Sequence, residues 1–303
     1  MSRVVALLCA LLPAACTHHP GTVASPHYTL GPSYESGGTW RYPRESYDAN
    51  LTGLATIYTG KHPPLTTDGE AFDQAALAAA HPTLQLPAIA RLTDLETGRQ
   101  IVVRINDRGP TTPHRLIAVT ARTAKLLEFP ASGVARVRLE VLPAESRAAV
   151  DSLPGAPSLP MSASPRASVQ ELPLAPLAGT SAAPPAWKAP EVPATVSAAT
   201  APPLRLPETM TLTIPAPGAL WVRLGSFQSY RYAAIQHARL SVLHPEIVAA
   251  EQGGQQEFRV RLGPFATISQ ADAALDQAIG AGVTDAHIAV ESGAGSTHEE
   301  FAQ

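Results

Sequence analysis

The feature that most constrains this chain is a stretch rich in proline, alanine and serine that covers residues 143–216. About half of the chain's 30 prolines fall in it, and no helical or strand period of apolar residues is seen there. Such a composition buries too little apolar surface to offset the entropy of ordering the backbone. The sequence therefore predicts two folded units, joined by a long disordered linker over 143–216 that is semi-extended because of its prolines.

The first folded unit is predicted over residues 53–142 and is mainly β. Its expected strands alternate apolar and polar residues or are rich in β-branched residues, and they cover 54–58, 89–93, 100–105 and 134–142. We expect a short helix over 120–128 with Thr120 as its N-cap. We also expect a helical turn over 77–80 that ends at His81, because proline follows that residue.

Three ionisable residues of this unit are candidates for acid–base chemistry. Glu70 follows a glycine turn, His81 ends an alanine run, and Asp107 follows a β-branched run. The ordinary interpretations stay open, namely a solvated glutamate, a structural histidine and a turn aspartate that accepts backbone N–H groups. Two acids and an imidazole in one small domain also suit general acid–base catalysis on a sugar.

The second folded unit is predicted over residues 217–292 and contains an internal repeat. The sequence Val-Arg-Leu-Gly-Ser-Phe at 222–227 returns as Val-Arg-Leu-Gly-Pro-Phe at 260–265. Each copy is followed by an alanine-rich run that fits a helix, and further strands fit 246–250 and 286–291. The resulting β-α-β-β-α-β order is typical of a ferredoxin-like α+β fold.

Strand alternation places polar residues of the two repeat strands on one face of the sheet. Trp221 and Arg223 share that face of the first strand, and Arg259 and Arg261 occupy the matching face of the second. A tryptophan and arginines suit sugar stacking and carboxylate binding. A merely solvated sheet face is the alternative.

The N-terminus is predicted to be a signal peptide over residues 1–16. Arg3 precedes an apolar run at 4–12, and small residues lead to Cys16 as in a lipobox, although Pro13 stands where leucine is usual. Lipidation of Cys16 is expected, and an ordinary secretory signal is the alternative. Cys16 would be the only cysteine of the mature chain, so no intramolecular disulfide is expected.

Two further segments complete the chain. Residues 17–52 read as a tether and an aromatic arm that packs on the first unit, with a sugar-stacking platform as the alternative. Residues 293–303 read as a disordered tail. Cysteine and histidine show no zinc spacing, so neither a metal nor a cofactor is predicted. The net charge of −3 gives no general attraction to nucleic acid.

The first unit resembles the double-psi β-barrel domain of the rare lipoprotein A family of endolytic peptidoglycan transglycosylases. The residues that carry the resemblance are 53–55, Tyr58, 67–70, Phe72, Asp73, 79–81, Thr83, Leu84, 92–95, Gly98, Arg99, 102–104 and 106–110. The resemblance implies that Asp107 is the leading acid/base, with His81 as an orienting or proton-sharing partner and Glu70 as a second carboxylate. It also implies glycan contacts through Tyr58, Asn106 and Arg108. The sequence departs from the family at Ala118, where an aspartate is usual, and at Ile57, where a tryptophan is usual.

The second unit resembles the sporulation-related repeat (SPOR) domain, whose members bind glycan strands stripped of their stem peptides. This resemblance implies glycan binding through Trp221, Arg223, Arg259 and Arg261. The lipobox resemblance implies anchoring at the periplasmic side of the outer membrane, with a soluble periplasmic or secreted protein as the alternative.

Together the resemblances imply a lytic transglycosylase that cuts naked strands between N-acetylmuramic acid and N-acetylglucosamine. The expected product has a 1,6-anhydro end, and the expected role is wall remodelling at the septum. A non-catalytic peptidoglycan-binding lipoprotein and a structural septal factor that recruits unknown partners are the other hypotheses.

Overall fold

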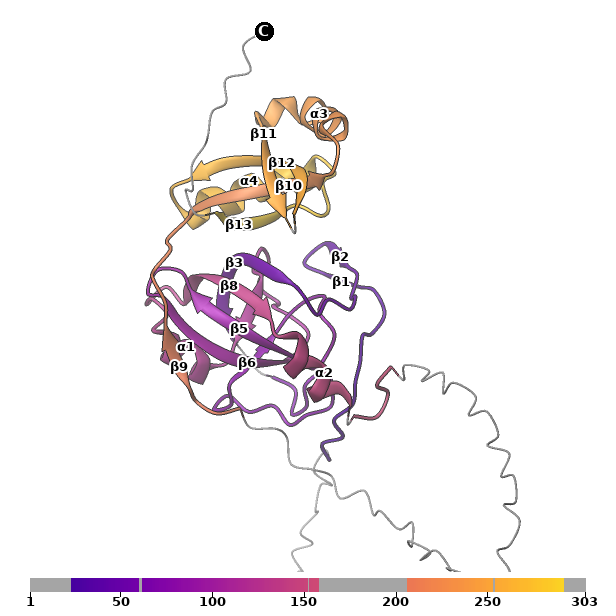
Figure 1. The fold of residues 1–303 in the computed structure, drawn as a ribbon, viewed down its shortest axis with the longest axis vertical. Helices are drawn as coiled ribbons and strands as arrows, with labels where there is room; N and C mark the ends of the chain where they lie inside the picture. The colour runs from indigo at the N-terminus through magenta and orange to yellow at the C-terminus, as the bar shows by residue number, and fades with distance from the viewer. Residues whose placement is uncertain (1–22, 60–61, 152, 158–205, 253, 292–303) are drawn as a thin grey trace, which may run out of the picture.

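The computed structural model describes residues 23–59, 62–151, 153–157, 206–252 and 254–291 (Figure 1). The signal peptide with Cys16, most of the predicted linker and the predicted tail therefore lie outside the described residues. Within the described ranges, no helix is both long and apolar enough to cross a membrane.

The first unit is a closed barrel of six strands with a seventh strand added at one edge. Hydrogen bonds join the strands in the order β4-β7-β3-β8-β5-β6-β9, and a further pairing of β4 with β6 closes the barrel. The β3–β7 and β4–β6 pairs are parallel and the others antiparallel. The strands are β3 (Asn50–Ile57), β4 (Ala78–Ala80), β5 (Ala88–Asp94), β6 (Arg99–Asp107), β7 (Ile117–Val119), β8 (Val134–Val141) and β9 (Met210–Leu212).

The alternating sequence of the strands explains the barrel core. Along β8, every second residue from Ala135 to Val141 is buried, and these side chains join those of β5 and β6 in one apolar cluster. Helix α1 (Ala121–Leu127) follows β7, and the Thr120 hydroxyl caps it by accepting from the Thr123 N–H. The predicted strands, the helix and its cap are therefore confirmed.

The predicted helical turn over 77–80 is wrong, because Ala78–Ala80 form β4. This strand bonds β6 on one side and β7 on the other, so it closes the barrel. Alanine favours helix in isolation, but the tertiary pairing overrides that weak preference.

The N-terminal arm forms a two-stranded hairpin, β1 (Tyr34–Ser36) and β2 (Thr39–Arg41), beside the barrel (Figure 1). The Tyr34 hydroxyl donates to the carbonyl of Pro82 at 3.0 Å, which fixes the arm to the barrel as predicted. Trp40 and Tyr42 remain 55% and 63% exposed, so two rings of the arm are not used in packing.

The predicted linker is too long at both ends. Helix α2 (Pro143–Asp151) packs on β5, where the Ser146 hydroxyl accepts from the Ile89 N–H and donates to the Ile89 carbonyl. At the other end, β9 adds to the barrel sheet beside β6. Helix α2 and strand β9 are ordered because they contact the barrel, and amino-acid composition does not reveal such contacts.

The C-terminal unit has the predicted β-α-β-β-α-β order, and its antiparallel sheet runs β11-β12-β10-β13. The repeat strands β10 and β12 are neighbours in this sheet, and their apolar face is buried. Its elements are β10 (Ala219–Phe227), α3 (Tyr230–Arg239), the 3₁₀ turn η1 (Ser241–Leu243), β11 (Glu246–Gln252), β12 (Gln255–Phe265), α4 (Ile268–Gly280) and β13 (His287–Glu291).

Candidate active site

The barrel topology gathers the segments of all three predicted catalytic residues at one end of the barrel. Asp107 is the last residue of β6, and His81 directly follows β4, which runs parallel to β6. The His81 N–H donates to the Asp107 carbonyl at 3.1 Å. The loop that carries Glu70 joins them, because the Asp68 N–H donates to the Asn106 carbonyl at 3.2 Å.

The Asp107 carboxylate is held through one oxygen and left open at the other. Its Oδ1 accepts from the N–H of Thr67 at 3.0 Å, the hydroxyl of Thr67 at 2.5 Å and the N–H of Arg108 at 2.8 Å. Its Oδ2 lies 3.9 Å from Nδ1 of His62, and 10% of the side chain is exposed. Such one-sided anchoring fixes the carboxylate while keeping one oxygen for a ligand.

His62, the neighbour of that oxygen, belongs to a cluster of three rings. The imidazole of His62 stacks on Phe72 with centroids 4.0 Å apart, and the Tyr58 ring meets His62 edge-on at 4.3 Å. Burial, together with the charges of Asp107 and Asp68, raises the pKa of Tyr58, so its phenol stays protonated.

Four polar atoms of this region are buried without a hydrogen-bond partner in the part of the chain that the structure describes. They are Tyr58 Oη, His62 Nδ1, Asp68 Oδ2 and His81 Nε2. Buried polar atoms in proteins nearly always have partners, so a group of exceptions requires an explanation. Ordered internal water molecules would supply partners for such buried atoms.

Glu70 is fully engaged inside the protein. Its Oε1 accepts from Arg104 Nε at 2.7 Å and Nη2 at 2.6 Å, and its Oε2 accepts from Asn106 Nδ2 at 2.8 Å. The residue is only 4% exposed. This geometry makes Glu70 an anchor for β6 and Asn106, next to Asp107, and leaves it little access to a substrate.

Asp68 is a second buried carboxyl group in the same loop. Its Oδ1 accepts from the Thr66 hydroxyl at 2.7 Å and from the Glu70 N–H at 3.2 Å. Burial and the nearby negative charge of Glu70 raise the pKa of Asp68 to about 7.

The His81 imidazole is neutral, and its buried Nε2 has no hydrogen-bond partner among the described residues. Its Nδ1 accepts from the N–H groups of Thr83 and Leu84, both at 3.2 Å, which places the proton on Nε2. Burial, helped by the positive charges of Arg108 and Arg41, lowers the pKa of His81 to about 3. An orienting role fits this geometry, whereas a protonated imidazolium does not.

The predicted glycan contacts of the barrel divide into two groups. Asn106 and Arg108 hold the site together, since Asn106 bonds Glu70 and the Arg108 guanidinium donates to the carbonyls of His81, Leu84 and Leu30. These bonds give the two side chains a positioning role, and their contact with glycan stays a prediction. Tyr58 has a buried hydroxyl without a partner, and its contact with glycan also stays a prediction.

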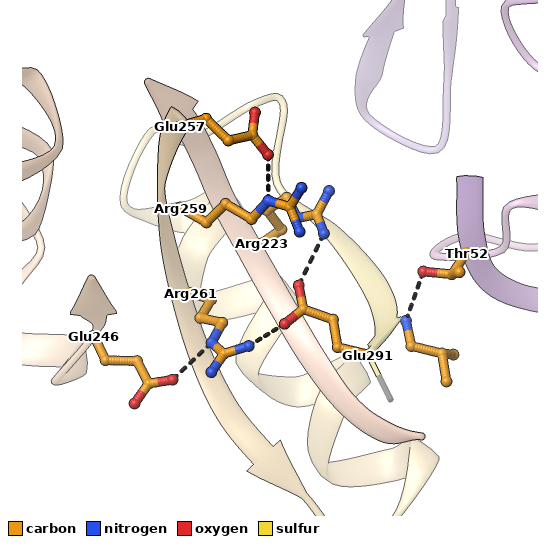
Figure 2. Close-up of polar contacts among 8 residues, drawn as sticks. Thr52, Arg223, Glu246, Glu257, Arg259, Arg261 and Glu291 are labelled. Carbon is orange, nitrogen blue, oxygen red and sulfur yellow. Dashed lines mark hydrogen bonds and ion pairs between the residues drawn. The ribbon is translucent and has the colours of Figure 1, made fainter. Parts of the chain in front are cut away.

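The side chains of the predicted binding face of the C-terminal unit lie close together, and Figure 2 shows its three arginines, whereas glycan binding there stays a prediction. The Arg261 guanidinium lies 3.6 Å from the centroid of the Trp221 ring, and Arg223 is opposite Arg261 in the neighbouring strand. Val222 and Leu224 point to the buried side of the sheet.

Sequence reasoning missed the acidic residues that pair with these arginines. Arg223 bonds Glu291 at 2.8 Å, and Arg261 bonds Glu246 at 2.6 Å and also reaches Glu291. Arg259 pairs with Glu257, two residues away on the same strand (Figure 2). The Arg259–Glu257 pair could have been predicted, because the two residues are two positions apart on β12 and so share one face of the strand. The other pairs join different strands, so they depend on the order of strands in the sheet.

In the barrel, the missed residues are His62, Thr67, Asp68 and Arg104. Arg104 had a detectable signal, because a charged residue inside a strand of β-branched residues needs a buried partner. The others lie in a loop whose path the sequence pattern does not specify.

Comparison with known proteins agrees with this architecture. The family model "Lytic transglycolase" matches residues 50–139, and the "SPOR domain" model matches residues 216–287. A double-psi β-barrel with a carboxylate cluster, followed by a SPOR domain, defines a class of lytic transglycosylases.

The relatives identify the family. The chain is 31% identical over 258 residues to "Endolytic peptidoglycan transglycosylase RlpA" of Pseudomonas aeruginosa strain UCBPP-PA14, which covers 83% of this chain and 72% of the relative. The protein of the same name from Rickettsia bellii is 35% identical over 124 residues, 40% of this chain and 55% of the relative. The chain therefore belongs to the RlpA family, and its barrel is the lytic transglycosylase domain.

Among solved structures, the match to the Streptomyces papain inhibitor covers 31% of this chain and 94% of the inhibitor's chain, with 21% sequence identity and a TM-score of 0.25.

Proposed function

We propose that this lytic transglycosylase cuts peptidoglycan strands internally, between N-acetylmuramic acid and N-acetylglucosamine. The observation that carries the proposal is the one-sided anchoring of Asp107, which leaves Oδ2 free for a substrate. Protonated Asp107 gives its proton to the glycosidic oxygen, and cleavage passes through an oxocarbenium-like state. The C6 hydroxyl of the same muramic acid then attacks C1 and returns its proton to Asp107. The product has a 1,6-anhydro end, and no water is consumed.

The neighbours of Asp107 support this chemistry. Thr67 and the Arg108 N–H fix the carboxylate, as preorganised hydrogen bonds do in enzymes generally. His62 lies beside the open oxygen, where it can bond a sugar hydroxyl, and the Tyr58 ring packs edge-on against His62. Glu70 supports the site through Arg104 and takes no part in proton transfer.

We further propose that the substrate is glycan freed of stem peptides and that the enzyme remodels the wall at the septum. Removal of the peptide leaves a carboxylate on each muramic acid, and the arginine and tryptophan face of the SPOR domain suits such an anionic sugar. Cys16 is proposed as the lipid anchor that holds the chain at the periplasmic side of the outer membrane. Metabolic labelling with a fatty acid tests this, since Cys16→Ser removes the label if the proposal is right.

A non-catalytic peptidoglycan-binding lipoprotein is the second candidate function. The observation that favours it is Ala118, which lies opposite Ala80 in the β4–β7 pair and supplies no carboxylate where the family usually has one.

Product analysis in water labelled with oxygen-18 separates these functions. Denuded sacculi treated with the protein should release glycan ends that are one water lighter than hydrolysis products and carry no label. Labelled reducing ends would show a hydrolase, and no released ends at all would support the non-catalytic alternative.

A further inference from the structure

We propose that the barrel and the SPOR domain are docked as one body, and that the cleft between them holds a single peptide-free glycan strand against both. The inference rests on the proposed substrate class. It replaces the expectation of two binding modules on a free linker with one composite binding site.

The first observation is that Leu54, a leucine on the outer face of the barrel, is fully buried. Ala55 of β3 faces the barrel core, so its neighbour Leu54 points out of the barrel. Leu54 is nevertheless 0% exposed, because it belongs with Leu95 to the apolar core of the SPOR domain. Strand β13 lies beside β3, and its Val290 N–H donates to the Thr52 hydroxyl at 3.2 Å (Figure 2).

Ion pairs add a second set of contacts. Arg115 of the barrel donates to both oxygens of Asp272 in α4, at 2.8 and 3.1 Å. The neighbouring His114 places its Nδ1 3.4 Å from Asp272 and its Nε2 3.1 Å from Asp276. A two-pronged arginine–carboxylate pair fixes orientation as well as distance.

The chain that enters the SPOR domain is itself bound to the barrel. After β9 the Thr213 N–H donates to the Gly98 carbonyl at 2.8 Å, and the Ala216 N–H donates to the Leu95 carbonyl at 2.9 Å. Arg136 Nη1 then donates to the carbonyl of Gly218, one residue before β10. No free linker therefore separates the two domains at this point.

Docking creates a cleft of about 2010 Å³ that both domains line. It exceeds the roughly 300–1,000 Å³ of a typical small-molecule pocket, which fits a polymeric ligand. The exposed rings of Trp40 and Tyr42 line the barrel side, and Trp221 lines the SPOR side. The segment of His81, whose backbone bonds Asp107, lies in the same cleft, so a bound strand would pass close to the catalytic end of the barrel.

The charges of the cleft favour an anion. Seven arginines line it against three acidic side chains, Glu246, Asp285 and Glu291. The SPOR arginines have acidic partners, whereas Arg41, Arg44 and Arg138 of the barrel side make no ion pair with any described residue. Unpaired arginines opposite a tryptophan suit a sugar chain that repeats a carboxylate.

Calorimetry with a short peptide-free tetrasaccharide, in an Asp107→Asn full-length protein that cannot cleave it, tests the inference. We expect one oligosaccharide to bind per chain. Trp40→Ala and Trp221→Ala should each lower the affinity of that single binding event about threefold to tenfold, which is the usual contribution of an aromatic contact. Tyr232→Ala, which removes an exposed ring outside the cleft, serves as the control and should change nothing.

Two independent binding events per chain, or an affinity that Trp40→Ala leaves unchanged, would overturn the composite site. Those results would leave the proposed function intact if wild-type protein still produces anhydro ends. Conversely, the shared cleft would stand if binding follows our expectation but no anhydro ends form.

Discussion

The guanidinium of Arg115 and the carboxylate of Asp272 form a two-pronged ion pair between the barrel and the SPOR domain, at 2.8 and 3.1 Å. Arg115 lies just before β7, and Asp272 lies in the first turns of α4. The pair forms only when the two domains are docked, because each domain supplies one of its residues. Both side chains are largely removed from solvent, so salt screens their attraction less than that of a surface pair.

Reversal of either charge should undock the domains. In the Arg115→Asp and Asp272→Arg variants we expect amide hydrogen exchange across β13 to accelerate about tenfold, because the outer edge of that strand is covered by β3 only while docked. The double variant restores an opposite-charge pair and should recover the slow exchange. Lys125→Asp, the same charge change on an exposed helix position, is the control. Equal exchange rates in the wild type and all four variants would contradict docking.

Glu70→Gln should act mainly on stability. The substitution leaves the buried Arg104 guanidinium without its anion, and losing one partner of a buried pair costs about 3–5 kcal/mol. Denaturant unfolding measures this free energy. If Glu70→Gln unfolds like the wild type yet loses activity, Glu70 takes part in the chemistry and its assignment as an anchor is wrong.

Asp68 predicts a pH dependence of stability. The folded protein keeps the Asp68 proton up to about pH 7, whereas the unfolded chain releases it near its ordinary pKa of 3.8. The folded state therefore binds more protons between these values, and the free energy of unfolding falls as pH rises from about 4 to about 7.

Asp68→Asn should remove that slope and keep the hydrogen bonds to Oδ1. At pH 8 the variant should be more stable than the wild type, by on the order of 4 kcal/mol if the full shift of about three pKa units is realised. Urea unfolding at pH 5 and pH 8 provides the measurement. A wild type and a variant with parallel pH profiles would contradict the raised pKa.

His81 should remain neutral throughout the physiological range. Nitrogen-15 spectra of the imidazole are expected to show a protonated Nε2 and an unprotonated Nδ1 down to pH 5, since burial lowers the pKa of His81 to about 3. Titration of this ring between pH 5 and pH 8 would show instead that His81 can exchange protons with a substrate or with Asp107.

Much of the fold could be predicted from local patterns. The alternation in β8 and the repeated motif in β10 and β12 identify the strands and the internal face of each sheet. The exceptions share one physical cause, which is tertiary contact. Ala78–Ala80 form a strand because two neighbours pair with them, and α2 and β9 are ordered because they pack against the barrel.

The candidate site could be located but not fully interpreted from the sequence. The positions of Asp107, His81 and Glu70 follow from motifs, yet their different roles follow from hydrogen bonds between segments distant in the chain. Only the folded barrel shows that Arg104 engages Glu70 and that His62 lies beside Asp107.

The most direct test of the account is mass spectrometry of denuded sacculi digested with wild type and with Asp107→Asn. Asn keeps an oxygen for Thr67 and Arg108, but its amide can neither protonate the leaving oxygen nor take up the C6 hydroxyl proton, so release of anhydro-ended glycan should fall by about 10²–10⁴-fold. Binding to the sacculi should be unchanged, and Asp48→Asn, at an exposed site, should behave like the wild type. Asp107→Asn that still releases anhydro ends at the wild-type rate would contradict the assignment of Asp107 as the acid/base.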